Sequence, residues 1–238
     1  LTATPYRLTS EAEGSMLKFL NRTTPKIFDE CLYYVQNDVL FNEGHLAPLE
    51  YYDFNSIDRT RLEINAKGTD FTEASMRSYI RQNNIHEKTA MYANALLAKR
   101  RNLLVFCTLL DEAQKVARLV PGSVVLSGDT DPALRAKILA QFKAGTIRCV
   151  INCGVLTTGF DFPGLDTVLN AISTMSLSLY YQILGRVIRP YTYPDGTKKV
   201  GWYVDLGGNI QKFGKVETMQ IRTNSKGDMS IWNNGKQL

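Results

Sequence analysis

Short apolar runs that alternate with helical patterns are the feature that most constrains this chain. Four such runs are Leu103–Cys107, Ser123–Leu126, Ile147–Cys153 and Asp166–Ala171, and a last strand is expected within Lys198–Leu206. Runs without a polar face suit strands that are buried on both sides. Strands that alternate with helices indicate an α/β fold, in which helices cover both faces of a parallel sheet.

Polar residues follow these expected strands. In open parallel sheets, ligands bind outside the carboxyl ends of the strands. We therefore expect one edge of the sheet to carry the functional side chains. The groups expected there are Thr108, Ser127, Thr157, Thr158, Asp161 and an arginine-bearing helix that ends at Pro190.

Helix-capping residues set the expected helix boundaries. Asp131 before Pro132 is a strong start, because an aspartate accepts bonds from free amides and proline fits the first turn. Thr108 and Ser176 are expected to cap the helices that follow them. Gly145 is expected to end the helix that begins after Asp131.

The chain before Leu103 is less regular. Polar residues over Thr9–Pro25 indicate an interdomain linker with a short helical turn. Pro48 favours an edge position for the strand around it, because proline cannot donate to a ladder. The other expected elements are a helix within Lys26–Phe41 capped by Asp29, a strand at Leu46–Phe54, helices at Thr72–Arg81 and His86–Arg101, and a hairpin of Val216–Arg222 with Met229–Trp232.

The segment Tyr181–Pro190, YQILGRVIRP, combines an apolar helical pattern with two arginines. A helix that continues to the proline would place Gln182, Arg186 and Arg189 on one face. Guanidinium groups keep their charge and match phosphate oxygens in geometry, so this face suits a polyanion. A solvated basic helix face is the structural alternative.

A second polar string, Gly154–Gly164, follows the strand expected at Ile147–Cys153. The hydroxyl groups of Thr157 and Thr158 can bond to a phosphate backbone, and Gly159 allows a tight turn. An ordinary Thr-Thr-Gly turn is the structural alternative.

Composition restricts the classes of partner and site. The 238 residues carry a net charge of +5 and a pI of about 9.0, which permits a nucleic-acid partner. The four cysteines form no C-x-x-C pair, so we expect buried thiols and no metal site. No apolar run is long enough to cross a bilayer, so we expect a cytoplasmic protein without a membrane partner.

Four strings resemble the motifs of superfamily 2 helicases and translocases, and they occur along the chain in the family's order. Q-x-x-G-R-x-x-R-P at residues 182–190 resembles motif VI, and Gly154–Gly164 closely resembles motif V. Cys107–Thr108 resembles motif IV, and Thr2–Pro5 resembles motif III. The chain is therefore similar to the second RecA-like motor domain of such an enzyme, preceded by the tail of the first. On this resemblance we expect a tail and linker at 1–24, the motor domain at 25–212 and an extension at 213–238.

The resemblance implies an ATP-dependent motor. ATP and Mg²⁺ would be bound jointly with an N-terminal RecA-like domain of the same protein, and Arg189, with Arg186, would act as the arginine finger. The ATP-binding residues that it implies are Gln182, Gly159, Asp161, Arg186 and Arg189. The nucleic-acid-binding residues that it implies are Cys107, Thr108, Ser127, Gly128, Thr157 and Thr158, and Thr2 and Thr4 would couple the two domains.

The chain contains no GxxxxGK[ST] string. We therefore expect it to be part of a longer enzyme and to be inactive in ATP hydrolysis alone. It looks most similar to RadD-type and to phage and restriction-type DNA translocases, which implies single-stranded or branched DNA as partner and a role in repair, recombination or restriction. Gln182 stands where DEAD-box RNA helicases usually carry a histidine. An RNA helicase and a non-catalytic nucleic-acid-binding module stay open as alternatives.

Overall fold

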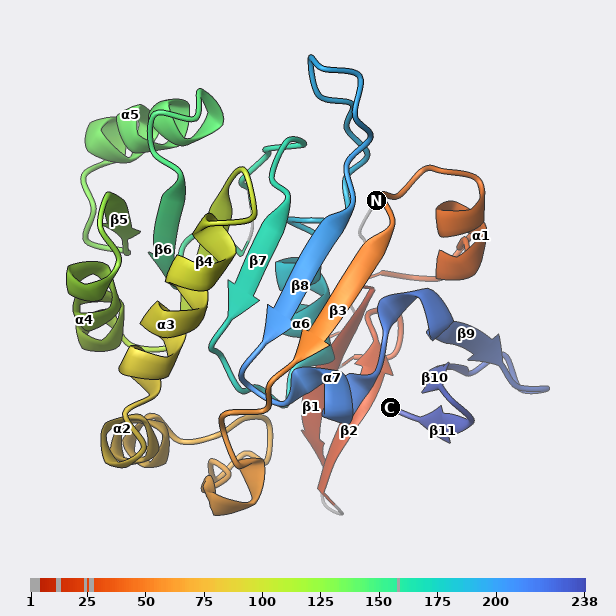
Figure 1. The fold of residues 1–238 in the computed structure, drawn as a ribbon. Coiled ribbons are helices and arrows are strands. Elements are labelled where there is room, and N and C mark those ends of the chain that lie inside the picture. The colour runs from red at the N-terminus through yellow and green to blue at the C-terminus, as the bar shows by residue number, and fades with distance from the viewer. Residues whose placement is uncertain (1–4, 12–13, 24, 26–27, 158) are drawn as a thin grey trace.

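A six-stranded parallel sheet forms the centre of the computed structural model, which describes residues 5–11, 14–23, 25, 28–157 and 159–238 (Figure 1). In spatial order the strands are β3 (Leu49–Asp53), β8 (Gly201–Asp205), β7 (Thr167–Asn170), β4 (Leu103–Cys107), β6 (Cys149–Cys153) and β5 (Ser123–Leu126). Every neighbouring pair runs parallel. The predicted α/β class is therefore confirmed, and β3 takes the predicted edge position.

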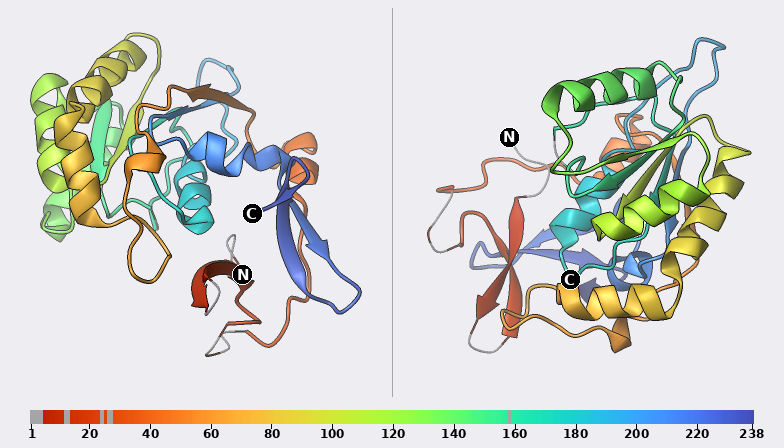
Figure 2. Two further views of the ribbon diagram at one scale, coloured as in Figure 1. Left: turned by 90° about the horizontal axis from the view of Figure 1, so that it is seen from below. Right: turned by 90° about the vertical axis from the view of Figure 1, so that its left-hand side faces the viewer.

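Helices cover both faces of this sheet (Figure 2). The helices α3 (Ile85–Leu97) and α4 (Leu110–Leu119) bury apolar residues against one face. The helices α5 (Pro132–Lys143), α6 (Leu177–Leu184) and α7 (Asn209–Phe213) do so against the other face. The helix α2 (Glu73–Gln82) and a 3-10 turn at Arg59–Arg61 flank a smaller apolar cluster. Among the described residues, no helix is long and apolar enough to cross a membrane.

Capping follows the prediction at α5 and α6. Asp131 Oδ1 accepts the amides at the start of α5 at 3.0 Å, and Ser176 Oγ accepts the Leu179 amide at 3.2 Å at the start of α6. The prediction that Thr108 caps α4 is wrong. Leu109 occupies the cap position, and the Glu112 carboxylate accepts the Thr108 and Leu109 amides instead. The Glu112 side chain therefore bonds back to the backbone that precedes the helix.

The first described segment is an antiparallel hairpin, so the short helical turn predicted within Thr9–Pro25 is wrong. Its strands are β1 (Tyr6–Glu11) and β2 (Gly14–Phe19). The Tyr6 and Phe19 rings are buried in the main apolar cluster with centroids 6.0 Å apart. The hairpin also contacts α6, where Ser178 Oγ donates to the Tyr6 carbonyl at 2.8 Å. Burial at its ends, rather than a continuous apolar pattern, orders this hairpin.

The helix predicted within Lys26–Phe41 is much shorter than expected. The helix α1 spans Asn37–Asn42, and Asp29 does not cap it. The Gln36 side chain, at the cap position, instead exchanges two bonds with the Ile221 backbone, at 2.8 and 3.0 Å. A long-range contact therefore sets where this helix begins.

A second, smaller sheet closes the chain. It contains β9 (Gln220–Thr223), β10 (Met229–Asn233) and β11 (Lys236–Gln237), all antiparallel, after a 3-10 turn at Val216–Thr218. The predicted hairpin of Val216–Arg222 with Met229–Trp232 is confirmed, with a shorter first strand. This small sheet lies beside the main sheet and is separate from it (Figure 2).

Candidate functional site

The two arginines of residues 182–190 lie beyond their helix. The helix α6 ends at Leu184, with Gly185 as the C-cap. The next amides bond to carbonyls only three residues back, from Arg186 at 3.1 Å and from Val187 at 2.9 Å. The prediction that the helix continues to Pro190, with Gln182, Arg186 and Arg189 on one helical face, is therefore wrong. The chain tightens before the proline is reached.

Both arginines are held by the connection between β6 and β7. The Arg189 guanidinium forms an ion pair with the Asp161 carboxylate, and both side chains remain partly exposed. Arg186 donates to the Phe160 carbonyl and, through Nε, to the Gln182 carbonyl at 3.2 Å. Burial lowers the pKa of the Arg186 guanidinium. The structure thus brings Asp161 and both arginines together.

This cluster lies at the amino edge of the sheet. The Ile188 carbonyl accepts the Ala47 amide at 2.7 Å, just before β3 starts. A helix that leaves the carboxyl end of one parallel strand must return to the amino end of the next, and α6 covers about 12 Å of that return. The prediction that one edge carries all the functional side chains is therefore wrong. Thr108, Ser127 and Thr157 follow carboxyl ends, whereas Arg186, Arg189 and Asp161 lie at the opposite edge.

A buried lysine, which sequence reasoning missed, fixes the chain next to this cluster. Lys199 is buried, and its ammonium group donates to the Pro163 carbonyl at 2.7 Å and the Leu165 carbonyl at 3.0 Å. Burial lowers the pKa of Lys199 to about 7, with a smaller contribution from the positive charge of Arg189 and an opposing one from Asp166. The only sequence signal was a lysine pair just before an apolar strand.

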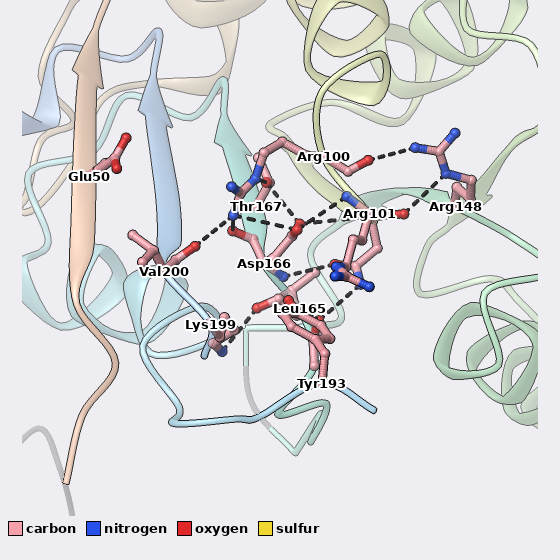
Figure 3. A network of polar contacts seen from close by, with 12 residues as sticks. Glu50, Arg100, Arg101, Arg148, Leu165, Asp166, Thr167, Tyr193, Lys199 and Val200 are labelled. Atoms are coloured by element: carbon pink, nitrogen blue, oxygen red, sulfur yellow. Dashed lines mark hydrogen bonds and ion pairs between the residues drawn. The ribbon is translucent and has the colours of Figure 1, made fainter. Parts of the chain in front are cut away.

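A polar network lies beside Lys199 and joins four segments at the amino edge (Figure 3). Asp166 is buried and pairs with Arg100, whose Nη2 also donates to the Val200 carbonyl at 2.6 Å. Arg101 pairs with Asp195 in the hairpin that projects from this edge in Figure 1. The network therefore anchors the starts of β7 and β8, between which the arginine segment runs.

The lowered pKa of Lys199 predicts a pH-dependent stability. In the unfolded chain a lysine keeps its proton to about pH 10.4, whereas in the folded chain it loses it near pH 7. Between these values the unfolded state binds more protons, so the free energy of unfolding should rise with pH. The free energy of unfolding can be measured in urea at about pH 6.5 and about pH 9.5. We expect it to rise between these pH values in the wild type and not in Lys199→Met. Lys198→Met, at an exposed neighbour, should behave as the wild type. An equal change of the unfolding free energy with pH in both variants would contradict the lowered pKa of Lys199.

At the carboxyl edge, the end of β4 is packed tightly. The Cys107 thiol is buried, and burial raises its pKa, so any contact by this residue would come from its backbone. Thr108 Oγ1 is buried and has no hydrogen-bond partner within the described part of the chain. Glu112 is also buried, which raises the pKa of its carboxyl to about 8. Thr108 therefore holds an unused hydroxyl beside the amides that Glu112 occupies.

The turn after β5 is preorganised by Arg135. Its Nη2 donates to the Ser127 carbonyl at 3.1 Å and the Thr130 carbonyl at 3.2 Å, while the Ser127 amide donates to Thr130 Oγ1 at 3.0 Å. Ser127 is buried, and Gly128 is exposed at the tip of the turn. The exposed backbone of this turn, rather than the Ser127 side chain, faces outward.

The turn after β6 depends on Asn152, another residue that sequence reasoning missed. Asn152 Oδ1 accepts the Val155 amide at 3.2 Å and the Leu156 amide at 2.8 Å. Thr157 follows, half-buried, and Gly159 takes a left-handed backbone with φ of 71°. The amide inside the apolar run CVINC was the available signal for this role. Thr2, Thr4 and Thr158 lie outside the described residues.

Comparisons with known proteins show that this chain is similar to helicases. Residues 87–191 match the family model of the helicase conserved C-terminal domain. The putative ATP-dependent helicase IRC3 of Saccharomyces cerevisiae is 29% identical over 136 residues, which are 53% of this chain and 19% of that protein. The ATP-dependent RNA helicase DBP3 of Eremothecium gossypii is 25% identical over 136 residues, which are 56% of this chain and 25% of that protein. The match thus spans a quarter or less of either relative.

A solved structure supports the fold. A fragment of a putative HsdR subunit of a type I restriction enzyme from Vibrio vulnificus has a TM-score of 0.60 at 19% identity, over 82% of this chain and 39% of that chain. Residues 87–191 are therefore similar to the helicase conserved C-terminal domain, and the sheet has a RecA-like fold.

Among the described residues, no group of three or more His, Cys, Asp or Glu side chains could hold a metal ion.

Proposed function

We propose that this domain is the C-terminal motor half of an ATP-dependent DNA helicase or translocase and supplies the arginine finger. The observation that carries the proposal is the pairing of Arg189 with Asp161 and of Arg186 with the Phe160 carbonyl at the amino edge. Two guanidinium groups held at one exposed edge suit a triphosphate bound by another domain.

The residues present fit ATP in part. The guanidinium groups match phosphate oxygens, but the phosphate-cradling lysine and the Mg²⁺ ligands would belong to an N-terminal RecA-like domain of the same protein. The bound nucleotide with Mg²⁺ would supply the phosphoryl group. Arg189 would then leave Asp161 to neutralise the charge that develops on the γ-phosphate, with Arg186 beside it. Gln182 and Gly159 would line the nucleotide, and this domain alone would not hydrolyse ATP.

The carboxyl edge would grip one nucleic-acid strand by its phosphates. The groups proposed for this grip are the backbone around Cys107, Thr108, Ser127 and Gly128 and the hydroxyls of Thr157 and Thr158. Such contacts give salt-dependent binding that tolerates sequence. With the strand at one edge and ATP at the other, closure of the two motor domains around ATP would move the strand.

We keep the domain boundaries and partners as proposals on the same resemblance. Residues 1–24 would be the tail of the first motor domain, with Thr2 and Thr4 coupling it to residues 25–212. Residues 213–238 would be an extension. The protein would act in the cytoplasm, on single-stranded or branched DNA, in repair, recombination or restriction.

DNA and RNA are distinguished by stimulation of ATP turnover. Support for DNA comes from Gln182 in motif VI and from the likeness to a restriction-enzyme subunit, while the likeness to DBP3 supports RNA. We expect single-stranded DNA to stimulate turnover by the full-length protein more than RNA of equal length. Stronger stimulation by RNA would overturn the DNA assignment. A folded protein that binds DNA but does not hydrolyse ATP would support the alternative, a non-catalytic nucleic-acid-binding module.

A further inference from the structure

The small C-terminal sheet has two unlike faces. Side chains alternate along a strand, so Ile221 and Ile231 point together toward the main apolar cluster. The opposite face is polar and aromatic. Its members are Gln220, Arg222, Ser230, Trp232 and Gln237, with Trp232 aligned opposite Gln220 and Gln237, and Ser230 opposite Arg222.

An indole–guanidinium stack lies at the centre of this outer face. The Arg222 guanidinium carbon lies 4.8 Å from the Trp232 ring centroid. Trp232 Nε1 donates to Ser230 Oγ at 2.9 Å, and Arg222 Nη2 donates to Gln220 Oε1 at 3.1 Å. These bonds fix the orientation of both planar groups before any ligand arrives. Arg222 is exposed and Trp232 is partly exposed, so the stack is accessible.

The charges around this face favour an anionic partner. Residues 213–238 carry four cations, Lys215, Arg222, Lys226 and Lys236, and two carboxylates, Glu217 and Asp228. Both carboxylates are engaged within the chain. Glu217 accepts the Tyr51 hydroxyl at 2.6 Å, and Asp228 pairs with Arg22 at 3.0 Å. Four cations against two carboxylates give residues 213–238 a net charge of +2.

We propose that this face binds single-stranded DNA, with an unpaired base stacked on the exposed plane of the Arg222–Trp232 pair. Guanidinium and indole planes both stack on bases and tolerate any sequence. The Lys226 ammonium group, in the exposed turn between β9 and β10, would meet a phosphate beside this face. The site is a contact additional to the carboxyl edge of the main sheet. This proposal rests on the proposed function in one respect, namely that the nucleic acid is DNA.

The 238-residue chain provides its own reporter, because it has two tryptophans, Trp202 and Trp232. In a Trp202→Phe background, titration with a thymidine oligonucleotide should quench Trp232 fluorescence to saturation. Loss of base stacking should weaken binding about 5- to 150-fold in Trp232→Leu. Arg222→Gln should weaken binding and reduce its dependence on salt. A uridine oligonucleotide tests whether RNA occupies the face instead.

Trp202→Phe is a matched control, because Trp202 also stacks on an arginine, Arg100 at 4.4 Å, but that arginine is bonded inside the main sheet. Its affinity for DNA should equal that of the wild type. DNA binding unchanged by Trp232→Leu and Arg222→Gln would overturn this inference and leave the proposed motor intact. Absence of any binding to the folded chain would overturn it too, while turnover by the full-length protein would test the motor separately. Tighter binding of the uridine strand would overturn the assignment to DNA.

Discussion

Replacement of Arg189 by alanine should lower nucleic-acid-stimulated ATP turnover by the full-length protein about 10³- to 10⁵-fold. The side chain is partly exposed at the amino edge, and among the described residues Asp161 is its ion-pair partner, so its guanidinium can turn to a phosphate without breaking a buried contact. Because the proposed finger would act on charge that develops during the reaction, the loss should fall on kcat, with KM for ATP changed much less.

Arg101→Ala is the matched control for that experiment. Arg101 is an exposed arginine at the same edge, paired with Asp195 in the projecting hairpin, and no role in the reaction is assigned to it. Its turnover should stay close to that of the wild type. Arg189→Lys keeps the charge but loses the planar fork, so we expect incomplete rescue. Turnover unaffected by Arg189→Ala would leave an ATPase whose finger lies elsewhere.

Asp166→Ala should destabilise the domain by about 3–5 kcal/mol, because it removes one partner of a buried ion pair. Figure 3 shows Asp166 between the two arginines and the start of β7. Its carboxylate accepts the Arg101 amide at 3.1 Å and the Thr167 hydroxyl at 3.0 Å, and it lies 3.4 Å from Arg100 Nη2. Without it, the Arg100 charge stays in a site with little water. Urea unfolding measures the loss.

The Arg101→Ala variant also serves as the control for stability. Its side-chain pair with Asp195 is exposed to solvent, and exposed pairs contribute little. Its free energy of unfolding should therefore change far less than that of Asp166→Ala. If both variants lose the same small amount, the network of Figure 3 does not hold the amino edge together.

Local patterns predicted the parts of the fold that local interactions determine. The strand β4 and the helix α5 have the predicted bounds, because an apolar run and an Asp-Pro start each act within a few residues. The end of α6, the start of α1 and the first hairpin were missed. Each depends on a contact with a distant segment, such as Gln36 with the Ile221 backbone.

The site shows the same division. Sequence identified Arg186, Arg189 and Asp161 as a group, and the structure brings them together. It did not predict the edge on which they lie, because the direction of the returning chain, not the order of motifs, decides that. Lys199 was also missed, since a lysine before a strand looks exposed until the carbonyls of Pro163 and Leu165 are seen around it.

The central claim is that Arg189 meets the γ-phosphate of a nucleotide held by another motor domain. Binding of ADP with aluminium fluoride and Mg²⁺ to the full-length protein, in the presence of single-stranded DNA, tests it most directly. The account predicts that this transition-state mimic binds the wild type much more tightly than ADP alone, and that Arg189→Ala loses the difference while keeping its affinity for ADP. Equal tightening in the wild type and the variant would contradict it.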